Sequence, residues 1–116
     1  MLEFTLPIRL VNPLNNRRHW RTVHARGKRE KDIVALRLYA DRGLCDQVLP
    51  VRVELTRIGK KKMDSDSLTA SFKHVRDGVS FWLGCDDGDE SKVTWRYVQE
   101  IGKEYAVRVR IEEVKA

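Results

Sequence analysis

The chain has 116 residues, of which 41% are hydrophobic and 34% are charged. This length and composition predict a single globular domain over residues 1–116. The chain is too short to form two domains. The longest apolar runs span a few residues, which excludes a membrane-spanning helix. The first residues lack the basic start and apolar stretch of a signal peptide, so we expect a cytoplasmic protein.

The net charge of +6 is concentrated in one segment, from Arg9 to Lys31. This segment holds eight basic residues and one acid, so it carries +7 while the rest of the chain sums to −1. Such a cluster is typical of a surface that binds a polyanion, although a solvated face without a partner has the same composition. With an exposed turn at 60–62, it supplies the expected DNA contacts: Arg17, Arg18, Arg21, Arg26, Lys28, Lys60, Lys61 and Lys62.

The two cysteines, Cys45 and Cys85, form no Cys-x-x-Cys pair, and no histidine has a companion at zinc-ligand spacing. We therefore expect two free thiols in a reducing compartment and no zinc site.

Apolar residues alternate with other residues from Phe4 to Leu10, which predicts a first strand. A break at 12–16 and a basic loop to about Gly27 follow. Helical spacing predicts a first helix over 28–42 that stops at Gly43. Pro50 then opens a second strand with an alternating pattern over 51–56.

A second helix is predicted to begin near Asp66, a good N-cap residue. Its apolar stripe consists of Leu68, Phe72, Val75 and Val79. Two further strands are predicted over 92–99 and 104–114. The expected fold is α+β, with two helices on a small mixed sheet in the order β-α-β-α-β-β.

Two acidic residues, Asp64 and Asp66, follow the three lysines of the 60–62 turn. In extended backbone, residues two apart point to the same side, so both carboxylates can reach one cation. On a helix they diverge by about 200°, which makes a shared ligand role plausible only where a strand gives way to a helix. The alternative for Asp66 is a helix cap alone.

A second acidic cluster, Asp86 to Glu90, lies in the loop before a strand. Hard cations such as Mg²⁺ or Mn²⁺ prefer oxygen ligands, and two acidic clusters beside a DNA-binding surface suit metal-assisted hydrolysis of a phosphodiester. Acids repel phosphate unless a cation lies between them. The alternative is a hydrophilic turn containing Gly88.

Lys73 and Asp77 follow Asp66 by seven and eleven residues, which places all three within about 20° on one helix face. Lys73 can contact the scissile phosphate or steady the attacking water. Equally, it can form an ion pair with Asp77, worth a few tenths of a kcal/mol.

Three segments together resemble the RusA-like Holliday junction resolvases, which are crossover junction endodeoxyribonucleases often encoded by phages. The family pattern has an Asp-x-Asp-Asn-Leu opening, a Lys four residues before a helical Asp, and an Asp-Asp pair after an apolar stretch. The matching segments are Asp64-Ser65-Asp66-Ser67-Leu68, Lys73-His74-Val75-Arg76-Asp77-Gly78, and Phe81-Trp82-Leu83-Gly84-Cys85-Asp86-Asp87. The segment 12–17, with Asn15 and Asn16, resembles a Pro-x-Asn-Asn-Arg segment of the same family.

The resemblance implies a RusA-like fold and a homodimeric, Mg²⁺-dependent endonuclease that cuts branched DNA. It implies Asp64, Asp66 and Asp87 as metal ligands, with Asp86 as a substitute for Asp87, and Lys73 as a catalytic residue. Asn15 and Asn16 join the expected DNA contacts. Ser67 stands where the family has Asn, and Lys73 lies seven residues after Asp66 instead of four.

Two other functions are compatible with these features. A non-catalytic, structure-selective nucleic-acid-binding module of the same fold would keep the basic segment without turnover. A phosphohydrolase acting on small molecules would use similar carboxylates, but it gives no reason for the +7 segment.

Overall fold

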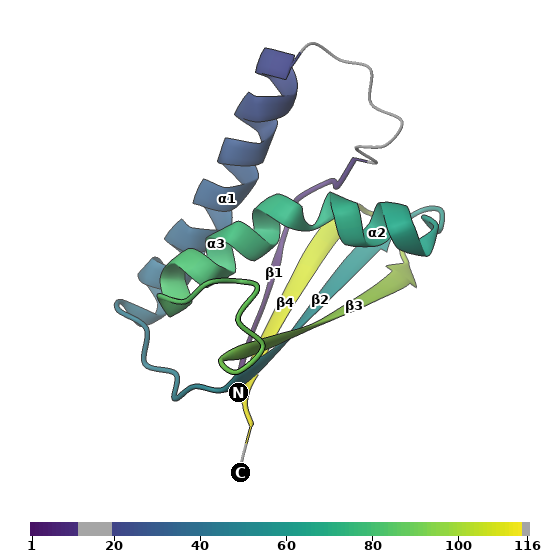
Figure 1. The fold of residues 1–116 in the computed structure, drawn as a ribbon. Helices are drawn as coiled ribbons and strands as arrows, with labels where there is room; N and C mark the ends of the chain where they lie inside the picture. The colour runs from purple at the N-terminus through teal and green to yellow at the C-terminus, as the bar shows by residue number, and fades with distance from the viewer. Residues whose placement is uncertain (12–19, 115–116) are drawn as a thin grey trace.

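The computed structural model describes residues 1–11 and 20–114, without the side chains of 20–23. The fold is α+β, with a four-stranded mixed sheet and three helices (Figure 1). The elements in chain order are β1 (Leu2–Leu6), α1 (Trp20–Arg42), β2 (Val51–Gly59), α2 (Ser65–Ser71), α3 (Lys73–Leu83), β3 (Val93–Ile101) and β4 (Ala106–Glu113).

The strands lie in the order β1-β4-β2-β3. β4 pairs antiparallel with both β1 and β2, whereas β2 and β3 are parallel. Because a parallel pair needs a crossover, the chain runs from the end of β2 through α2 and α3 back to the start of β3. The end of β2 and the start of β3 therefore lie at opposite ends of the sheet.

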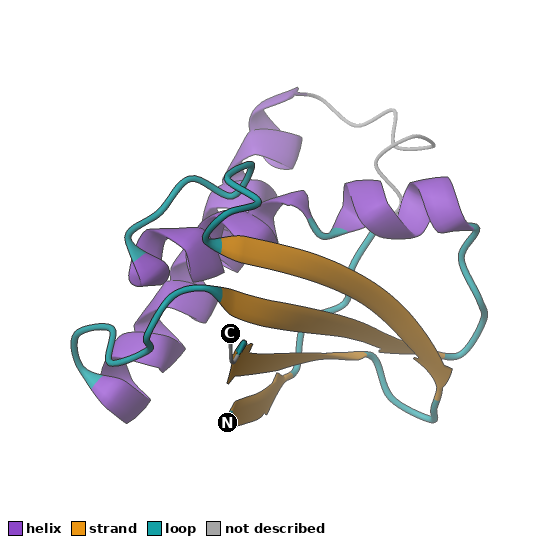
Figure 2. Cartoon of the chain, turned by 60° about the horizontal axis from the view of Figure 1, so that its bottom comes forward, coloured by secondary structure: helices purple, strands orange, loops and turns teal. Residues whose placement is uncertain are grey.

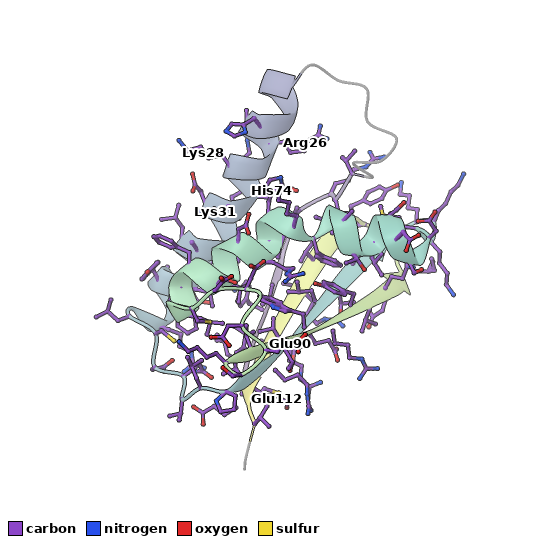
Figure 3. The ribbon with its side chains drawn as sticks, viewed as in Figure 1. Arg26, Lys28, Lys31, His74, Glu90 and Glu112 are labelled. Atoms are coloured by element: carbon purple, nitrogen blue, oxygen red, sulfur yellow. The ribbon has the colours of Figure 1, made fainter. Side chains whose placement is uncertain are left out.

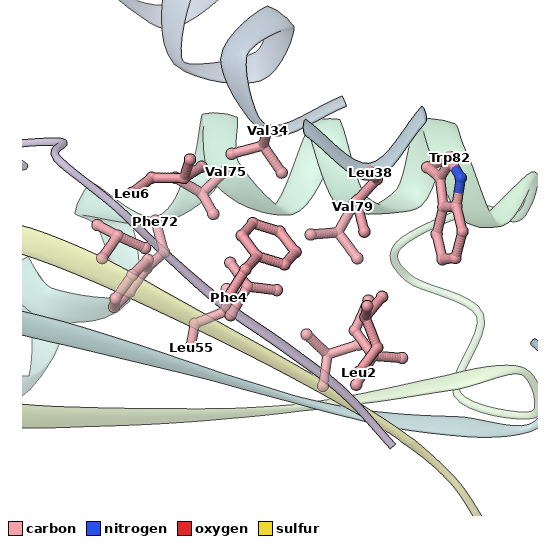
Figure 4. Packing of buried hydrophobic residues seen from close by; sticks show 14 of the residues in the cluster. Leu2, Phe4, Leu6, Val34, Leu38, Leu55, Phe72, Val75, Val79 and Trp82 are labelled. Carbon is pink, nitrogen blue, oxygen red and sulfur yellow. The ribbon is translucent and has the colours of Figure 1, made fainter. Parts of the chain in front are cut away.

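The helices cover one face of the sheet, and no described helix covers the other (Figure 2). Alternate strand residues point toward the helices and are buried, including Val53, Val109 and Ile111. The predicted stripe of Leu68, Phe72, Val75 and Val79 is confirmed, since all four side chains are buried. Figure 4 shows part of this stripe packed with Phe4 and Leu55 of the sheet and Val34 and Leu38 of α1.

Helix α1 begins at Trp20, so the predicted basic loop to Gly27 is wrong over residues 20–27. Gly27 lies inside this helix, where a Cβ atom would come within 2.5 Å of the His74 ring. A Cβ atom at Gly78 of α3 would likewise come within 2.6 Å of the Lys31 carbonyl oxygen. The two glycines allow α1 and α3 to approach closely, and this packing outweighs their low helix propensity.

The predicted second helix is two helices, so the element order is β-α-β-α-α-β-β. At Phe72 the backbone has ψ −1°, and its amide donates to the carbonyl of Thr69, three residues earlier. The Leu68 carbonyl, which a continuous helix would offer to Phe72, accepts the Ser71 hydroxyl instead.

The ends of α1 and α3 meet near Gly43, whose φ of 71° confirms the predicted stop. Trp82 is buried, and its indole Nε1 donates to the Gly43 carbonyl at 2.9 Å. Phe81 is 60% exposed and lies against Tyr39. Within residues 1–11 and 20–114, no helix is long and apolar enough to cross a membrane.

Candidate functional site

Asp64 and Asp66 lie at the junction of β2 and α2, as the spacing predicted. Asp64, in extended backbone, is the N-cap of α2, and its Oδ1 accepts the Ser67 amide at 2.8 Å. Hydrogen bonds from the Ser67 hydroxyl and amide lower the pKa of Asp64, so it is ionised at neutral pH. Asp66 is in the first turn and exposed. The cap is therefore Asp64 and not Asp66.

The aspartates of the 86–90 loop have hydrogen-bond or ion-pair partners in the loop itself and in the adjacent α3 and β3. The Asp86 carboxylate accepts the Gly88 amide at 3.0 Å, and that of Asp89 accepts the Ser91 amide at 3.1 Å. Such bonds are typical of Asx turns. Asp87 forms a 3.3 Å ion pair with Arg76, and its carbonyl accepts the Trp95 indole at 2.8 Å. These contacts are the ones expected if the acidic cluster is a hydrophilic turn, the alternative to a metal-binding cluster.

One chain does not bring Asp64, Asp66 and Asp87 together. Met63, next to Asp64, is hydrogen-bonded to the side chain of Gln99, while Asp87 is bonded to Trp95. Gln99 and Trp95 are four residues apart on β3, which corresponds to about 13 Å. In the described part of the chain, no group of three or more His, Cys, Asp or Glu residues is placed to hold a metal ion. Asp86, the substitute ligand, belongs to the same distant loop.

Arg76 of α3 lies against the aromatic side chains of β3 and beside Asp87. Its guanidinium lies 4.8 Å from the centre of the Trp95 ring and donates to the Tyr97 hydroxyl at 2.7 Å. The same group pairs with Asp87. Burial raises the pKa of Tyr97, although Arg76 opposes the shift, so the hydroxyl stays protonated and accepts this bond. Arg76 thus holds Asp87 at the β3 start.

Asp66 lies in the first turn of α2, whereas Lys73 is the first residue of α3, after the break at Phe72. Lys73 lines an open groove of about 450 Å³ between α1 and α3. Figure 3 shows Lys28 and Lys31 of α1 on the side of this groove that faces His74 of α3. The groove-lining residues are His24, Gly27, Lys28, Lys31, Asp32, Lys73, His74 and Asp77.

The charge of this α1–α3 groove depends on pH. Three lysines face two aspartates, so its charged side chains sum to a positive charge, to which protonation of His74 adds. Burial lowers the pKa of His74, against the attraction of Asp77, whose carboxylate lies 3.8 Å from its Nδ1. Among the described residues, Asp77 therefore lies within ion-pair distance of His74 and not, as the alternative had it, of Lys73.

The other expected DNA contacts are only partly visible. Asn15, Asn16, Arg17 and Arg18 lie outside the described residues, as does the side chain of Arg21. Arg26 is half-buried on α1. Lys60, Lys61 and Lys62 are exposed in the turn before Asp64, with the Lys60 ammonium 5.9 Å from the centre of the Tyr105 ring.

Arg57 is a charged residue of this region that the sequence patterns did not single out. It occupies an inward position of β2 and is only 7% exposed. Its Nη1 donates to the Lys61 carbonyl at 2.7 Å, and its Nε has no partner among the described residues. The alternation of the strand was the available signal, because Arg57 continues the inward series of Val51, Val53 and Leu55.

Replacing Arg57 with methionine should raise the free energy of unfolding by about 1–3 kcal/mol. The replacement removes a buried positive charge whose hydrogen-bond partner is a neutral carbonyl and not a carboxylate. Urea unfolding measures the change. Arg52→Met is the matched control: this side chain is 55% exposed on the opposite face of the same strand, and its replacement should change stability by less than about 0.5 kcal/mol. An equal or lower stability for Arg57→Met would contradict this account.

Glu30 is a second buried charged residue outside the predicted site. It lies on the inward face of α1, four residues before Val34, and is 7% exposed. Burial raises its pKa to about 7, although Arg26 one turn earlier opposes the shift. The spacing of Glu30, Val34 and Leu38 was the signal for this position.

Comparison of the chain with known protein families finds none that matches, and comparison with curated protein sequences also finds no match.

Proposed function

We propose that this protein is a divalent-metal-dependent endonuclease that cuts branched DNA, of the RusA-like kind that its motifs resemble. The observation that carries the proposal is the position of Asp64 and Asp66. Two carboxylates occupy a strand-to-helix junction directly after the exposed Lys60–Lys62 turn. Carboxylates in such basic surroundings are compatible with phosphate binding when a cation lies between them.

The donors at this junction fit a hard cation. The Ser67 amide donates to Oδ1 of Asp64, and Asp64 and Asp66 are both exposed. Mg²⁺ is commonly held by one or two carboxylates, with water and phosphate oxygens completing the shell. Bound there, Mg²⁺ or Mn²⁺ supplies Lewis-acid polarisation of a phosphate and a lowered pKa for a bound water.

The lysines have a distinct role in this proposal. Lys60, Lys61 and Lys62 attract the phosphate nearest the carboxylates, while Lys28, Lys31 and Lys73 line the α1–α3 groove and hold a second stretch of backbone. Lys73 is then a binding residue and not a catalytic one. A two-fold dimer suits the paired nicks that resolve a four-way junction.

A non-catalytic binder of branched DNA is the second candidate. It is favoured by the contacts of Asp86, Asp87 and Asp89, each of which has a partner that explains it without a metal. Both candidates use the same basic surface, so only turnover separates them.

The test is incubation of the protein with a labelled synthetic four-way junction in Mg²⁺, Mn²⁺ or EDTA, with a linear duplex of the same sequence as control. We expect paired nicks in the junction with either metal, an intact junction in EDTA and an intact duplex throughout. Binding of the junction without cleavage under every metal would identify the non-catalytic binder and refute the nuclease.

A further inference from the structure

The basic segment that joins β2 to α2 is hydrogen-bonded to the rest of the structure at every second residue. The Gly59 carbonyl accepts an amide of the β3–β4 connection at 2.9 Å, and the Lys61 carbonyl accepts Nη1 of Arg57 at 2.7 Å. Both backbone groups of Met63 bond to the side chain of Gln99, at 2.9 and 2.6 Å. A loop held at such short intervals keeps a defined backbone conformation without a ligand.

The bond from Arg57 differs from the others, because it comes from a buried cation. The side chain is 7% exposed, and its Nε has no partner among the described residues. The guanidinium lies over Gly59, where a Cβ atom would come within 2.9 Å of Nη2 and 3.0 Å of Cζ. A glycine in a strand often marks such a close approach. Gly59 thus leaves the space through which Arg57 reaches the Lys61 carbonyl.

This arrangement is unfavourable for folding. A neutral carbonyl compensates a buried cation less well than a carboxylate does, and an apolar side chain would suit the inward position of β2 better. Proteins accept such a cost in stability mainly where function needs it. Here the carbonyl that Arg57 binds belongs to the middle lysine of the exposed 60–62 turn.

We propose that Arg57 is a positioning residue of the DNA-binding surface, which holds the backbone of the Lys60–Lys62 turn in the conformation that meets a phosphate. This inference rests on the role of the turn in the proposed function. An ordered turn binds more tightly than a flexible one of equal charge, because the entropy of ordering is lost on folding and not on binding. Arg57 is itself too buried to offer a phosphate much surface, so it acts through the lysines.

Gel shifts with a labelled four-way junction in Ca²⁺ compare two ways of breaking the bond. Arg57→Met removes the guanidinium. Gly59→Ala keeps every charge and displaces the guanidinium from the Lys61 carbonyl, at a residue without positive φ. Each should weaken binding about tenfold, and the double variant should bind no more weakly than Arg57→Met alone.

Arg52→Met is the matched control for the binding measurement, because it removes the same charge from the exposed face of β2. It should bind within about twofold of wild type. If wild type binds the junction and Arg57→Met or Gly59→Ala binds equally well, or if Arg52→Met loses as much as Arg57→Met, the positioning role is wrong while the proposed function stands. A wild-type protein that does not bind the junction would refute the proposed function and this inference with it.

Backbone order in the free protein tests the bond without DNA. NMR relaxation should give amide order parameters near 0.85 for the 60–62 turn in wild type and below about 0.6 in Arg57→Met and Gly59→Ala. Arg57→Met should meanwhile unfold at no lower urea concentration than wild type, so weaker binding cannot come from a weaker fold. Equal order of the turn in wild type and Arg57→Met would overturn the inference, whatever the DNA measurements give.

Discussion

Replacement of Asp66 by asparagine should reduce the rate of cleavage of a four-way junction by more than about 100-fold. Replacing a residue that only hydrogen-bonds to a metal ligand already lowers metal affinity or activity by about 10–100-fold, and Asp66 is proposed as a ligand itself. The side chain is exposed and does not cap α2, since Asp64 does. Stability should therefore change by less than about 0.5 kcal/mol. Cleavage rates under single-turnover conditions measure the loss, and gel shifts in Ca²⁺ measure junction binding.

Asp41→Asn is the matched control for Asp66→Asn. Asp41 is an exposed aspartate of α1 whose partner is Arg37, at 2.7 Å, and it has no place in the proposed site. Its replacement should leave both cleavage and binding unchanged. If Asp66→Asn cleaves as fast as wild type, Asp66 is not a ligand; if it loses binding and cleavage together, its role is in binding and not in turnover.

Replacement of Glu30 by glutamine should raise the free energy of unfolding at pH 8 by up to about 3 kcal/mol. The pKa of Glu30 is raised from 4.5 to about 7 in the folded protein, and each pKa unit corresponds to about 1.4 kcal/mol. The folded state therefore keeps a proton that the unfolded state has lost. The contribution of this group is fully present below pH 4.5 and is lost as the pH rises through 7.

Urea unfolding of wild type and Glu30→Gln at pH 5 and pH 8 measures this effect as a difference, which cancels the titration of all other groups. The two proteins should differ little at pH 5 and most at pH 8. Glu104→Gln, at an exposed position, is the control and should differ from wild type equally at both pH values. A Glu30→Gln variant that is less stable at pH 8 would show that the carboxylate has a favourable partner in the folded protein.

The parts of the fold that follow from local periodicity could be predicted from the sequence. The strand from Val51 and the buried stripe through Phe72 and Val79 were read from spacing alone, because burial on one face imposes a period. The start of α1 could not be predicted, since Gly27 disfavours a helix and is tolerated only because His74 packs against it. Helix propensities describe single residues and therefore cannot predict the contact between Gly27 and His74.

The acidic residues show the same limit at the candidate site. Their types and spacing gave Asp64 and Asp66 at a strand-to-helix junction, which the structure has. The expected approach of Asp87 depended on the direction of β3. Its parallel pairing with β2 places the start of β3 at the other end of the sheet. The break at Phe72, which divides the predicted second helix in two, coincides with a side-chain hydrogen bond of Ser71 that no periodicity reveals.

The most direct test of the metal site is anomalous diffraction from crystals grown with Mn²⁺ and a junction DNA that resists cleavage. We predict a single strong peak per site beside the carboxylates of Asp64 and Asp66. A peak confined to the 86–90 loop, or bound DNA with no metal at the β2–α2 junction, would contradict the assignment of these aspartates.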